Sequence, residues 1–150
     1  MRPMSFTGEY VPSSLDWVRE QVAEYEASGG TRANTLRDTG IPIVVVTMQG
    51  LSGAVRKIAL MRVEHAGEYA LIASLGGAPE NPKWYANIVA HPTVLIQDGP
   101  EPAEYTVREV FGDERDEWFR RGAVVFPTYL EYAAKTDRVI PVLVASPAAG

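Results

Sequence analysis

The sequence predicts an α+β fold in which a mostly antiparallel sheet curls toward a barrel and helices flank it. Three observations lead to this prediction. Strand-like and helix-like segments follow one another in the order helix, three strands, helix, two strands, two helices, strand. The connections between successive strands have hairpin length, which favours antiparallel pairing. A doubly wound parallel fold would place a helix between nearly every pair of strands, and the chain lacks that alternation.

The first element is a helix over residues 13–28. Its apolar residues recur at helical spacing, and the pair Gly29-Gly30 ends it. Ser13 or Ser14 is expected to cap its start. The helical apolar positions are Leu15, Val18 and Val22.

The whole chain, residues 1–150, is expected to form one domain. Residues 1–12 form a loose arm, and residues 41–147 form the barrel core. The run IPIVVVTM is typical of a strand that is buried on both faces. Hairpin turns are expected at Ala66-Gly67 and around Gly99-Pro100. The predicted strands are residues 41–48, 56–65, 68–74, 93–99, 103–110 and 138–145.

Three further helices are expected at residues 81–92, 113–126 and 127–136. Asn81 is a good cap for the first of them, and Pro82 suits its first helical position. The acidic run at the start of the second suits a helix N-terminus and a solvated face. Its expected (i, i+4) ion pairs are Asp116–Arg120 and Glu117–Arg121.

Composition excludes several classes of function. The net charge of −5 argues against a broad nucleic-acid surface, and the longest apolar runs fall far short of a membrane span. The chain has no cysteine and only two histidines, His65 and His91, neither near a second ligand at a recognised spacing, so no metal site is expected. A cytoplasmic protein without an apolar leader is the plain interpretation.

The segment LIASLGGAPENPKWYANIVAHP, residues 71–92, is the strongest candidate for a binding site. Glycines after a strand let the backbone approach a ligand closely, and a helix N-terminus attracts anions. Lys83 adds a positive charge, Trp84 a flat surface and Asn87 a polar group one turn later.

A purely structural interpretation of the same residues stays open. In it, Trp84 and Ile88, and likewise Tyr85 and Val89, are core pairs, and the glycines only turn the chain. The segment QGLSGAVRK, residues 49–57, is a second glycine-rich turn followed by two cations. Two such loops on one barrel can hold an anionic ligand from both sides.

Three segments resemble the deazaflavin-dependent nitroreductase family of actinobacteria: IPIVVVTMQGLSGAVR, GAPENPKWYANIVAHP and FPTYLEYAAKTDRVIPVLV. The resemblance runs from about Ile41 to Pro147. It implies a six-stranded split β-barrel similar to FMN-binding barrels. It also implies coenzyme F420, a phosphorylated deazaflavin with a lactyl-oligoglutamate tail, as a two-electron hydride donor.

The resemblance also implies a site. It places Ser74, Tyr129 and Tyr132 at the catalytic centre, with both tyrosines on the acceptor side of the ring. Core packing at (i, i+3) is the structural alternative for both tyrosines, and for Tyr129 it explains the residue equally well. Ser74 also belongs to the cofactor groove. The implied cofactor-binding residues are Thr47, Ser52, Gly53, Arg56, Lys57, Ser74, Gly76, Gly77, Lys83, Trp84 and Asn87.

The sequence departs from the family pattern on the anion-binding side. In the family, the loop that corresponds to the one around Leu51 is one residue longer and carries two cations that this chain lacks. The lysine that usually precedes the glycine pair is Leu75 here. The family usually has a proline three positions after Arg56, where this chain has Ala59. Weaker or differently posed binding of the anionic tail is expected, and Lys57 is the residue that can compensate.

The predicted function is hydride transfer from reduced F420 to a small electron-poor acceptor, such as a nitroaromatic, a quinone or an activated enone or lactone. Two alternatives stay open. One is an FMN-dependent oxidoreductase on the same barrel, and the other is a non-catalytic barrel that sequesters a cofactor or lipid. The sequence leaves a homodimer open as well.

Overall fold

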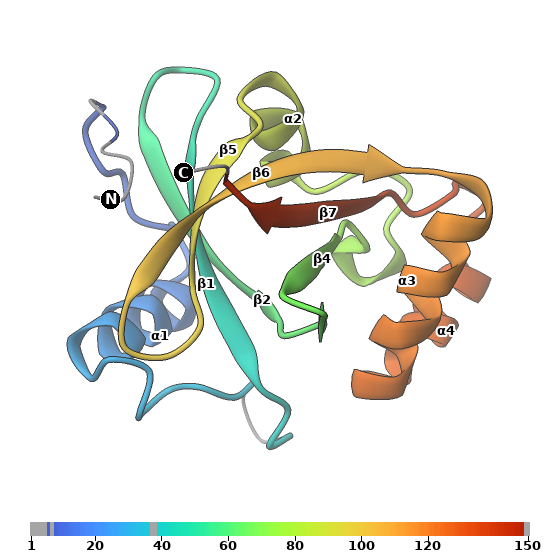
Figure 1. Cartoon of the computed structure of the whole chain (residues 1–150), viewed down its shortest axis with the longest axis horizontal. Coiled ribbons are helices and arrows are strands. Elements are labelled where there is room, and N and C mark those ends of the chain that lie inside the picture. The colour runs from blue at the N-terminus through green and yellow to red at the C-terminus, as the bar shows by residue number, and fades with distance from the viewer. Residues whose placement is uncertain (1–5, 7, 37–38, 149–150) are drawn as a thin grey trace.

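One curled antiparallel sheet forms the centre of the computed structural model, which describes residues 6, 8–36 and 39–148 (Figure 1). All paired strands are antiparallel, and their order across the sheet is β2-β1-β5-β6-β7-β4-β3. This confirms the predicted α+β class and the split barrel, which is open between β2 and β3. The strands are β1 (Ile43–Gln49), β2 (Val55–Met61), β3 (Glu64–His65), β4 (Glu68–Ile72), β5 (Thr93–Gln97), β6 (Pro102–Val110) and β7 (Val142–Pro147).

The described residues contain seven strands where the sequence predicted six, because the segment 56–65 is divided. After Met61 the chain leaves β1 and pairs with β4 as the short strand β3. Arg62 lies at this corner and donates a hydrogen bond of 2.8 Å to Asp98. The change of partner strand therefore produces the extra strand.

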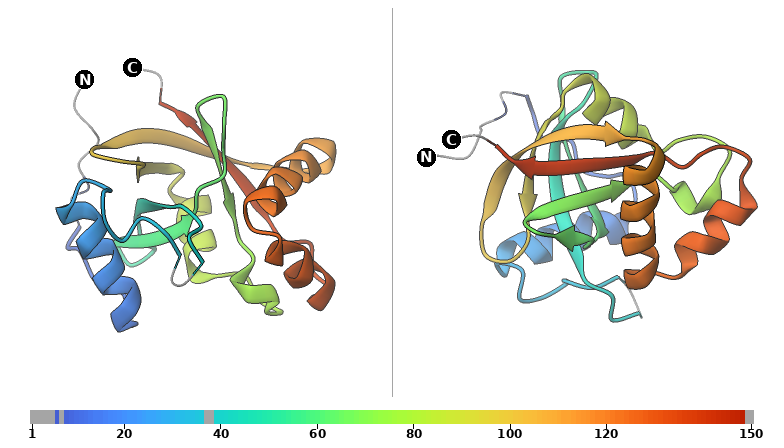
Figure 2. Two further views of the ribbon diagram at one scale, coloured as in Figure 1. Left: turned by 90° about the horizontal axis from the view of Figure 1, so that it is seen from below. Right: turned by 45° about the vertical axis from the view of Figure 1, so that its right-hand side comes forward.

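Four helices and one 3₁₀ turn surround the sheet within the described residues. The two further views show α1 on one side of the sheet and the pair α3 and α4 on the opposite side (Figure 2). These elements are α1 (Asp16–Ala27), η1 (Leu75–Gly77), α2 (Lys83–Ala90), α3 (Gly112–Val125) and α4 (Thr128–Lys135). None of the described helices is long and apolar enough to cross a bilayer.

Two glycine-containing turns are where the sequence predicted them. The hairpin between β3 and β4 turns at Ala66 and Gly67, whose φ angles are +53° and +83°. Helix α1 ends at Gly29 and Gly30, and the Gly30 N–H donates to the Tyr25 carbonyl at 2.9 Å. Positive φ angles of this kind are the reason that glycine ends helices.

The predicted helix caps are wrong. Leu15 occupies the N-cap position of α1, and the Ser13 hydroxyl instead accepts a hydrogen bond from the Leu15 N–H at 3.2 Å. In α2 the N-cap residue is Pro82 and not Asn81, so the helix begins one residue later than expected. Asn81 therefore precedes the cap, and its side chain is used elsewhere, as described below.

The N-terminal segment was expected to be a loose arm, but its residues 8–12 lie along the start of β2. The Val11 N–H donates to the Val55 carbonyl at 2.9 Å, and the Val55 N–H donates to the Glu9 carbonyl at 2.8 Å. Residues 1–5 and 7 lie outside the described residues. The paired part of the arm covers the edge of β2 beside the loop at residues 50–54.

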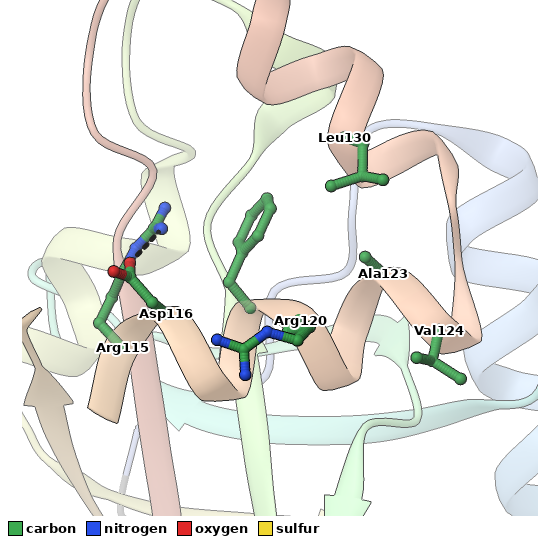
Figure 3. Close-up of a pocket in the computed structure, with 7 residues that line it drawn as sticks. Arg115, Asp116, Arg120, Ala123, Val124 and Leu130 are labelled. Carbon is green, nitrogen blue, oxygen red and sulfur yellow. Dashed lines mark hydrogen bonds and ion pairs between the residues drawn. The ribbon is translucent and has the colours of Figure 1, made fainter. Parts of the chain in front are cut away.

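A groove of about 500 Å³ lies between α3 and α4 (Figure 3). Near it, Arg121 donates to Glu117 at 2.8 Å as predicted, whereas Asp116 pairs with Arg115 at 3.1 Å rather than with Arg120. The groove is lined by Arg115, Asp116, Phe119, Arg120, Ala123, Val124 and Leu130.

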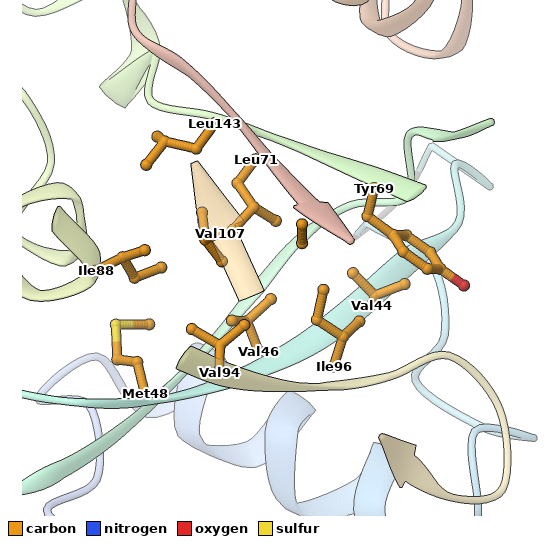
Figure 4. Close-up of a cluster of buried hydrophobic side chains, with 11 residues drawn as sticks. Val44, Val46, Met48, Tyr69, Leu71, Ile88, Val94, Ile96, Val107 and Leu143 are labelled. Atoms are coloured by element: carbon orange, nitrogen blue, oxygen red, sulfur yellow. The ribbon is translucent and has the colours of Figure 1, made fainter. Parts of the chain in front are cut away.

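Both faces of the central strands are buried, as the apolar run in β1 predicted. Val44, Val46 and Met48 point into the barrel, whereas Ile43 and Val45 pack against α1. Figure 4 shows the interior cluster, with side chains from β1, β4, β5, β6, β7 and α2 converging on one another. A third cluster lies between the sheet and the helices α3 and α4.

Helix α2 closes one end of the barrel with Ile88, which is fully buried in the interior cluster. Trp84 packs against the same cluster, so the predicted Trp84–Ile88 core pair is confirmed. Tyr85 also packs there, but Val89 is 53% exposed, so the Tyr85–Val89 pair is wrong.

This difference between neighbouring residues makes a test of the closing role of α2. Ile88→Ala should lower the free energy of unfolding by about 2–5 kcal/mol, because it removes buried methyl groups and leaves a cavity. The matched change Val89→Ala should alter it by no more than about 0.5 kcal/mol, because the side chain is exposed. Urea unfolding followed by circular dichroism measures both, and equal losses would contradict the assigned burial.

Candidate functional site

The loop after β4 turns through a run of left-handed residues. Ser74 has right-handed angles (φ −76°, ψ −37°), and Leu75, Gly76 and Gly77 follow with φ angles of +44°, +62° and +80°. A left-handed conformation costs a side-chain-bearing residue about 1–2 kcal/mol. Leu75 is therefore strained, whereas the two glycines adopt the same conformation freely.

This backbone leaves N–H groups available at the turn. The turn's own hydrogen bonds run from the Gly77 N–H to the Ser74 carbonyl (2.9 Å) and from the Ala78 N–H to the Leu75 carbonyl (3.1 Å). In the described part of the chain, the N–H groups of Ser74, Leu75 and Gly76 have no hydrogen-bond partner. Successive N–H groups at a right-handed to left-handed step form a concavity that suits an anion.

Arg138 holds this loop from behind, a role that the sequence analysis missed. The guanidinium donates to the carbonyls of Ala73 (3.2 Å), Ser74 (2.8 Å) and Ala78 (2.8 Å) and to the Asn81 side chain (2.8 Å). Arg138 was expected to begin a strand, but β7 begins only at Val142. The motif KTDR before an Ile-Pro pair was the available signal, and no local pattern assigns it this role.

Helix α4 packs closely against the left-handed turn. A methyl group in place of a hydrogen on Gly77 would lie 2.8 Å from the carbonyl oxygen of Tyr132. Only glycine therefore permits this approach, which brings the turn beside the tyrosines that the resemblance placed at the acceptor side. A methyl group on Gly76 would have no other atom within 4 Å, so Gly76 borders open space.

The two tyrosines of α4 differ in environment. Tyr129 is 5% exposed and Tyr132 is half-buried, and both rings pack edge-to-face against Phe126 at centroid distances of 5.0 and 6.0 Å. Burial raises the pKa of the Tyr129 hydroxyl far above its ordinary value, and the adjacent Tyr132 adds to the shift. Within the described residues that hydroxyl has no hydrogen-bond partner.

Helix α2 is fixed by side chains on two sides. The Tyr85 hydroxyl donates to Glu109 of β6 at 2.5 Å, and this hydrogen bond together with burial raises the pKa of Tyr85 to about 12. The side-chain Oδ1 of Asn87 accepts a hydrogen bond from the Leu51 N–H at 3.1 Å. Asn87 therefore joins the two glycine-rich segments that the sequence analysis treated as opposite halves of one site.

The basic residues near this site divide into two groups. Arg56 lies on the barrel-facing side of β2, and Lys83 is exposed at the start of α2; neither has an ion-pair partner among the described residues. Lys57 points to the opposite side, where it pairs with Glu26 of α1 at 2.7 Å, and Thr47 is its cross-strand partner. Neighbouring strand residues face opposite ways, which separates Lys57 from Arg56.

The remaining residues of the 50–54 loop are solvent-accessible. Ser52 and Gly53 are exposed, and the Ser52 hydroxyl accepts the Ala54 N–H at 3.4 Å. Leu51 and Leu75, the positions where the expected cations are replaced, are 64% and 46% exposed. Each of the two loops therefore exposes a leucine where the family pattern carries cations.

The structure thus brings most of the sequence-predicted residues to one end of the barrel. Gly77 packs against the Tyr132 backbone of α4, and Arg138 joins Ser74 to Asn81 before α2. Asn87 of α2 then contacts the 50–54 loop. Thr47 and Lys57 lie on the α1 face instead. The groove between α3 and α4 is lined by other residues, and none of them was among the predicted catalytic or cofactor-binding residues.

The comparison with protein families identifies the family of the chain. Residues 17–147 match the family model of the F420H(2)-dependent quinone reductases. The chain belongs to this family. It is therefore an F420H(2)-dependent oxidoreductase, with coenzyme F420 as the cofactor of its family.

Other members are similar over most of their length. An F420H(2)-dependent quinone reductase of Mycobacterium tuberculosis (strain ATCC 25618 / H37Rv) is 28% identical over 126 residues, which cover 81% of this chain and 84% of the relative. A putative F420H(2)-dependent quinone reductase of the same strain is 27% identical over 88 residues, covering 59% of this chain and 74% of the relative.

Solved structures give the same family and fold. An F420-H2 dependent reductase (FDR-A) is 47% identical with a TM-score of 0.67, covering 70% of this chain and 94% of that chain. A protein described as a domain-swapped dimer is 44% identical with a TM-score of 0.69, covering 89% and 100%. A heme storage protein from Vibrio cholerae, 9% identical with a TM-score of 0.53 over 89% and 92%, shares the fold alone.

The close approach of Gly77 to α4 supplies a test with an internal control. Gly77→Ala should lower the free energy of unfolding by more than Gly76→Ala, because both place a side chain at positive φ but only the first meets backbone atoms of Tyr132. We expect about 1–2 kcal/mol for Gly76→Ala from the left-handed conformation alone. Urea unfolding compares the two, and an equal or smaller loss for Gly77→Ala would refute the close packing.

Proposed function

We propose that the chain binds reduced F420 between the 50–54 loop, the turn at Ser74–Gly77 and the start of α2, and reduces a quinone there. One observation carries this proposal: unpartnered N–H groups at the turn and the unpaired cations Arg56 and Lys83 gather at the same end of the barrel. A phosphorylated cofactor with an acidic tail needs such a surface. The open space beside Gly76 suits the close approach of a flat ring.

In this assignment the groups of the turn and of α2 hold the cofactor. The N–H groups from Ser74 to Gly76, with Lys83 and Arg56, bind its anionic part, and Trp84 with Asn87 borders the groove. Ser52 and Gly53 lie at the exposed rim. Bound reduced F420 supplies a hydride, because its reactive ring position is carbon and favours two-electron transfer.

The protein then has to position the acceptor and stabilise the negative charge that develops on its oxygen during hydride transfer. Tyr132, which is half-buried beside the turn, lies on the acceptor side and can donate a hydrogen bond to a quinone oxygen. Burial raises the pKa of the Tyr129 hydroxyl further above its ordinary value, so Tyr129 is a poor proton donor. Hydride transfer gives the hydroquinone monoanion, and the one proton that completes the hydroquinone comes from solvent.

A homodimer is part of the proposal. A relative that is 44% identical over its whole length is described as a domain-swapped dimer. In this chain the sheet ends in two edge strands, β2 and β3, and the paired arm residues Glu9–Val11 cover only one end of β2. Open sheet edges are where chains commonly pair.

Cofactor choice is tested by tryptophan fluorescence. Titration with F420 should give saturable quenching, and parallel titration with FMN should give much weaker quenching. Trp84→Phe should remove most of the signal, because Trp84 borders the proposed groove, whereas Trp17→Phe on α1 should retain it. Tighter binding of FMN than of F420 would favour the flavin alternative, and binding without quinone reduction would favour a sequestering barrel.

The role of Tyr132 is tested by turnover of menadione, a soluble naphthoquinone, with reduced F420. Tyr132→Phe should lower kcat about 2- to 10-fold, because one neutral hydrogen bond contributes about 0.5–1.5 kcal/mol. The Kd for F420 should stay unchanged, because the hydroxyl faces the acceptor. Stopped-flow oxidation of reduced F420 measures kcat, and an unchanged value would reject Tyr132 as a catalytic residue.

A further inference from the structure

Arg138 bridges the two sides of the left-handed turn. Its guanidinium contacts Ala73 and Ser74, which precede the turn, and Ala78 and Asn81, which follow it. The Nη2 group donates to both carbonyls on the first side, and Nε and Nη1 donate to the second. One rigid, planar group with several donors thus spans a gap that a single ammonium group cannot.

The turn needs such support because its backbone is strained and the linker to α2 has few other contacts. Leu75 adopts a left-handed conformation, and the linker residues Pro79 and Glu80 are exposed. The turn's two backbone hydrogen bonds lie entirely within residues 74–78. The Ala73 N–H also donates to the Pro141 carbonyl at 3.0 Å, which links the first flank to the segment before β7, and Arg138 links both flanks to that segment.

The orientation of the carbonyls also decides the orientation of the N–H groups. Peptide groups are planar, so fixing the Ala73 and Ser74 carbonyls on the guanidinium directs the N–H groups of Ser74 and Leu75 to the opposite side. Those N–H groups belong to the anion-binding concavity described above. The hydrogen bond to Asn81 at the same time fixes the residue before the Pro82 cap of α2, and with it the helix that bears Lys83.

We infer that Arg138 is a positioning residue for cofactor binding, which holds the Ser74–Gly77 turn and the start of α2 in the conformation that receives the anionic part of F420. Arg138 does so through backbone carbonyls, and its own guanidinium is occupied by these contacts. This inference rests on the proposed function for the identity of the ligand. The organising role itself concerns the chain alone and is measurable without any ligand.

Arg115 supplies a matched control. Its guanidinium also donates to a backbone carbonyl, that of Ile140, at 2.9 and 3.3 Å, and it packs on the ring of Phe119. Ile140 is only two residues from Arg138, yet Arg115 has no contact with the turn. A loss of general packing in this region therefore affects both variants, whereas a loss of turn geometry affects only Arg138.

The test compares Arg138→Gln, Arg138→Lys and Arg115→Gln by hydrogen–deuterium exchange without ligand and by F420 titration. For Arg138→Gln we expect at least tenfold faster exchange at the hydrogen-bonded amides of Ala73, Gly77 and Ala78, and at least tenfold weaker F420 binding. Arg138→Lys should be intermediate, because lysine retains the charge but not the planar set of donors. Arg115→Gln should leave both quantities within twofold of the wild type.

Chemical rescue separates positioning from folding. Millimolar methylguanidinium, added to Arg138→Ala, should restore part of the exchange protection and of the F420 affinity, and it should have no effect on Arg115→Ala. If Arg138→Gln does not fold, the exchange and F420 affinity of Arg138→Lys, together with the methylguanidinium rescue, test the inference instead. Wild-type exchange and wild-type Kd in the Arg138 variants would overturn the inference.

The same data separate the two proposals. If the wild type does not bind F420, the proposed function fails, and the exchange measurements on the ligand-free protein alone decide whether Arg138 organises the turn. If the wild type binds F420 and the Arg138 variants exchange faster without weaker binding, the turn does not receive the cofactor and the positioning role is refuted.

Discussion

Burial of both faces of the sheet is the constraint on which the rest of the structure depends. Along β7, Leu143 and Ala145 point into the barrel while Val142 and Val144 pack under α3 and α4, and β1 is shared in the same way between the interior and α1. A sheet with two apolar faces needs cover on each, so it curls around one cluster and is flanked by helices on the outside. This arrangement leaves the strand ends and their loops to form the site.

The site combines strain with rigid support. The left-handed Leu75 is unfavourable by itself, and the close approach of Gly77 to α4 admits no side chain. Strained backbone persists only where the surroundings determine it, and here the support comes from Arg138, from α4 and from the α2 contacts of Asn87 and Tyr85. The support comes from segments far apart in the chain, so the geometry of the site depends on the complete fold.

Hydride transfer from reduced F420 needs few acid–base groups from the protein. The described residues contain no group of three or more side chains that could hold a metal ion. Burial raises the pKa of Tyr129 in α4, which makes it a poor proton donor. The contributions of this chain are a place for an anion, a surface for a flat ring and hydrogen-bond donors for an acceptor. Those contributions depend on position more than on reactivity, which is why loop geometry matters most here.

The sequence by itself determined the elements: the α+β class, the order of strands and helices, the hairpin at Ala66-Gly67, and the two-sided burial of β1. These follow from periodicity and turn chemistry, which are local properties of the chain. The glycine turn and α2 were also identifiable as a binding segment from residue types alone. The tertiary structure decided the partners: Asn81 binds Arg138 instead of capping α2, Lys57 pairs with Glu26 on the α1 face, and Arg138 holds the turn from a loop. Each of these depends on which face a side chain takes and on which distant segment meets it, and no local pattern carries that information.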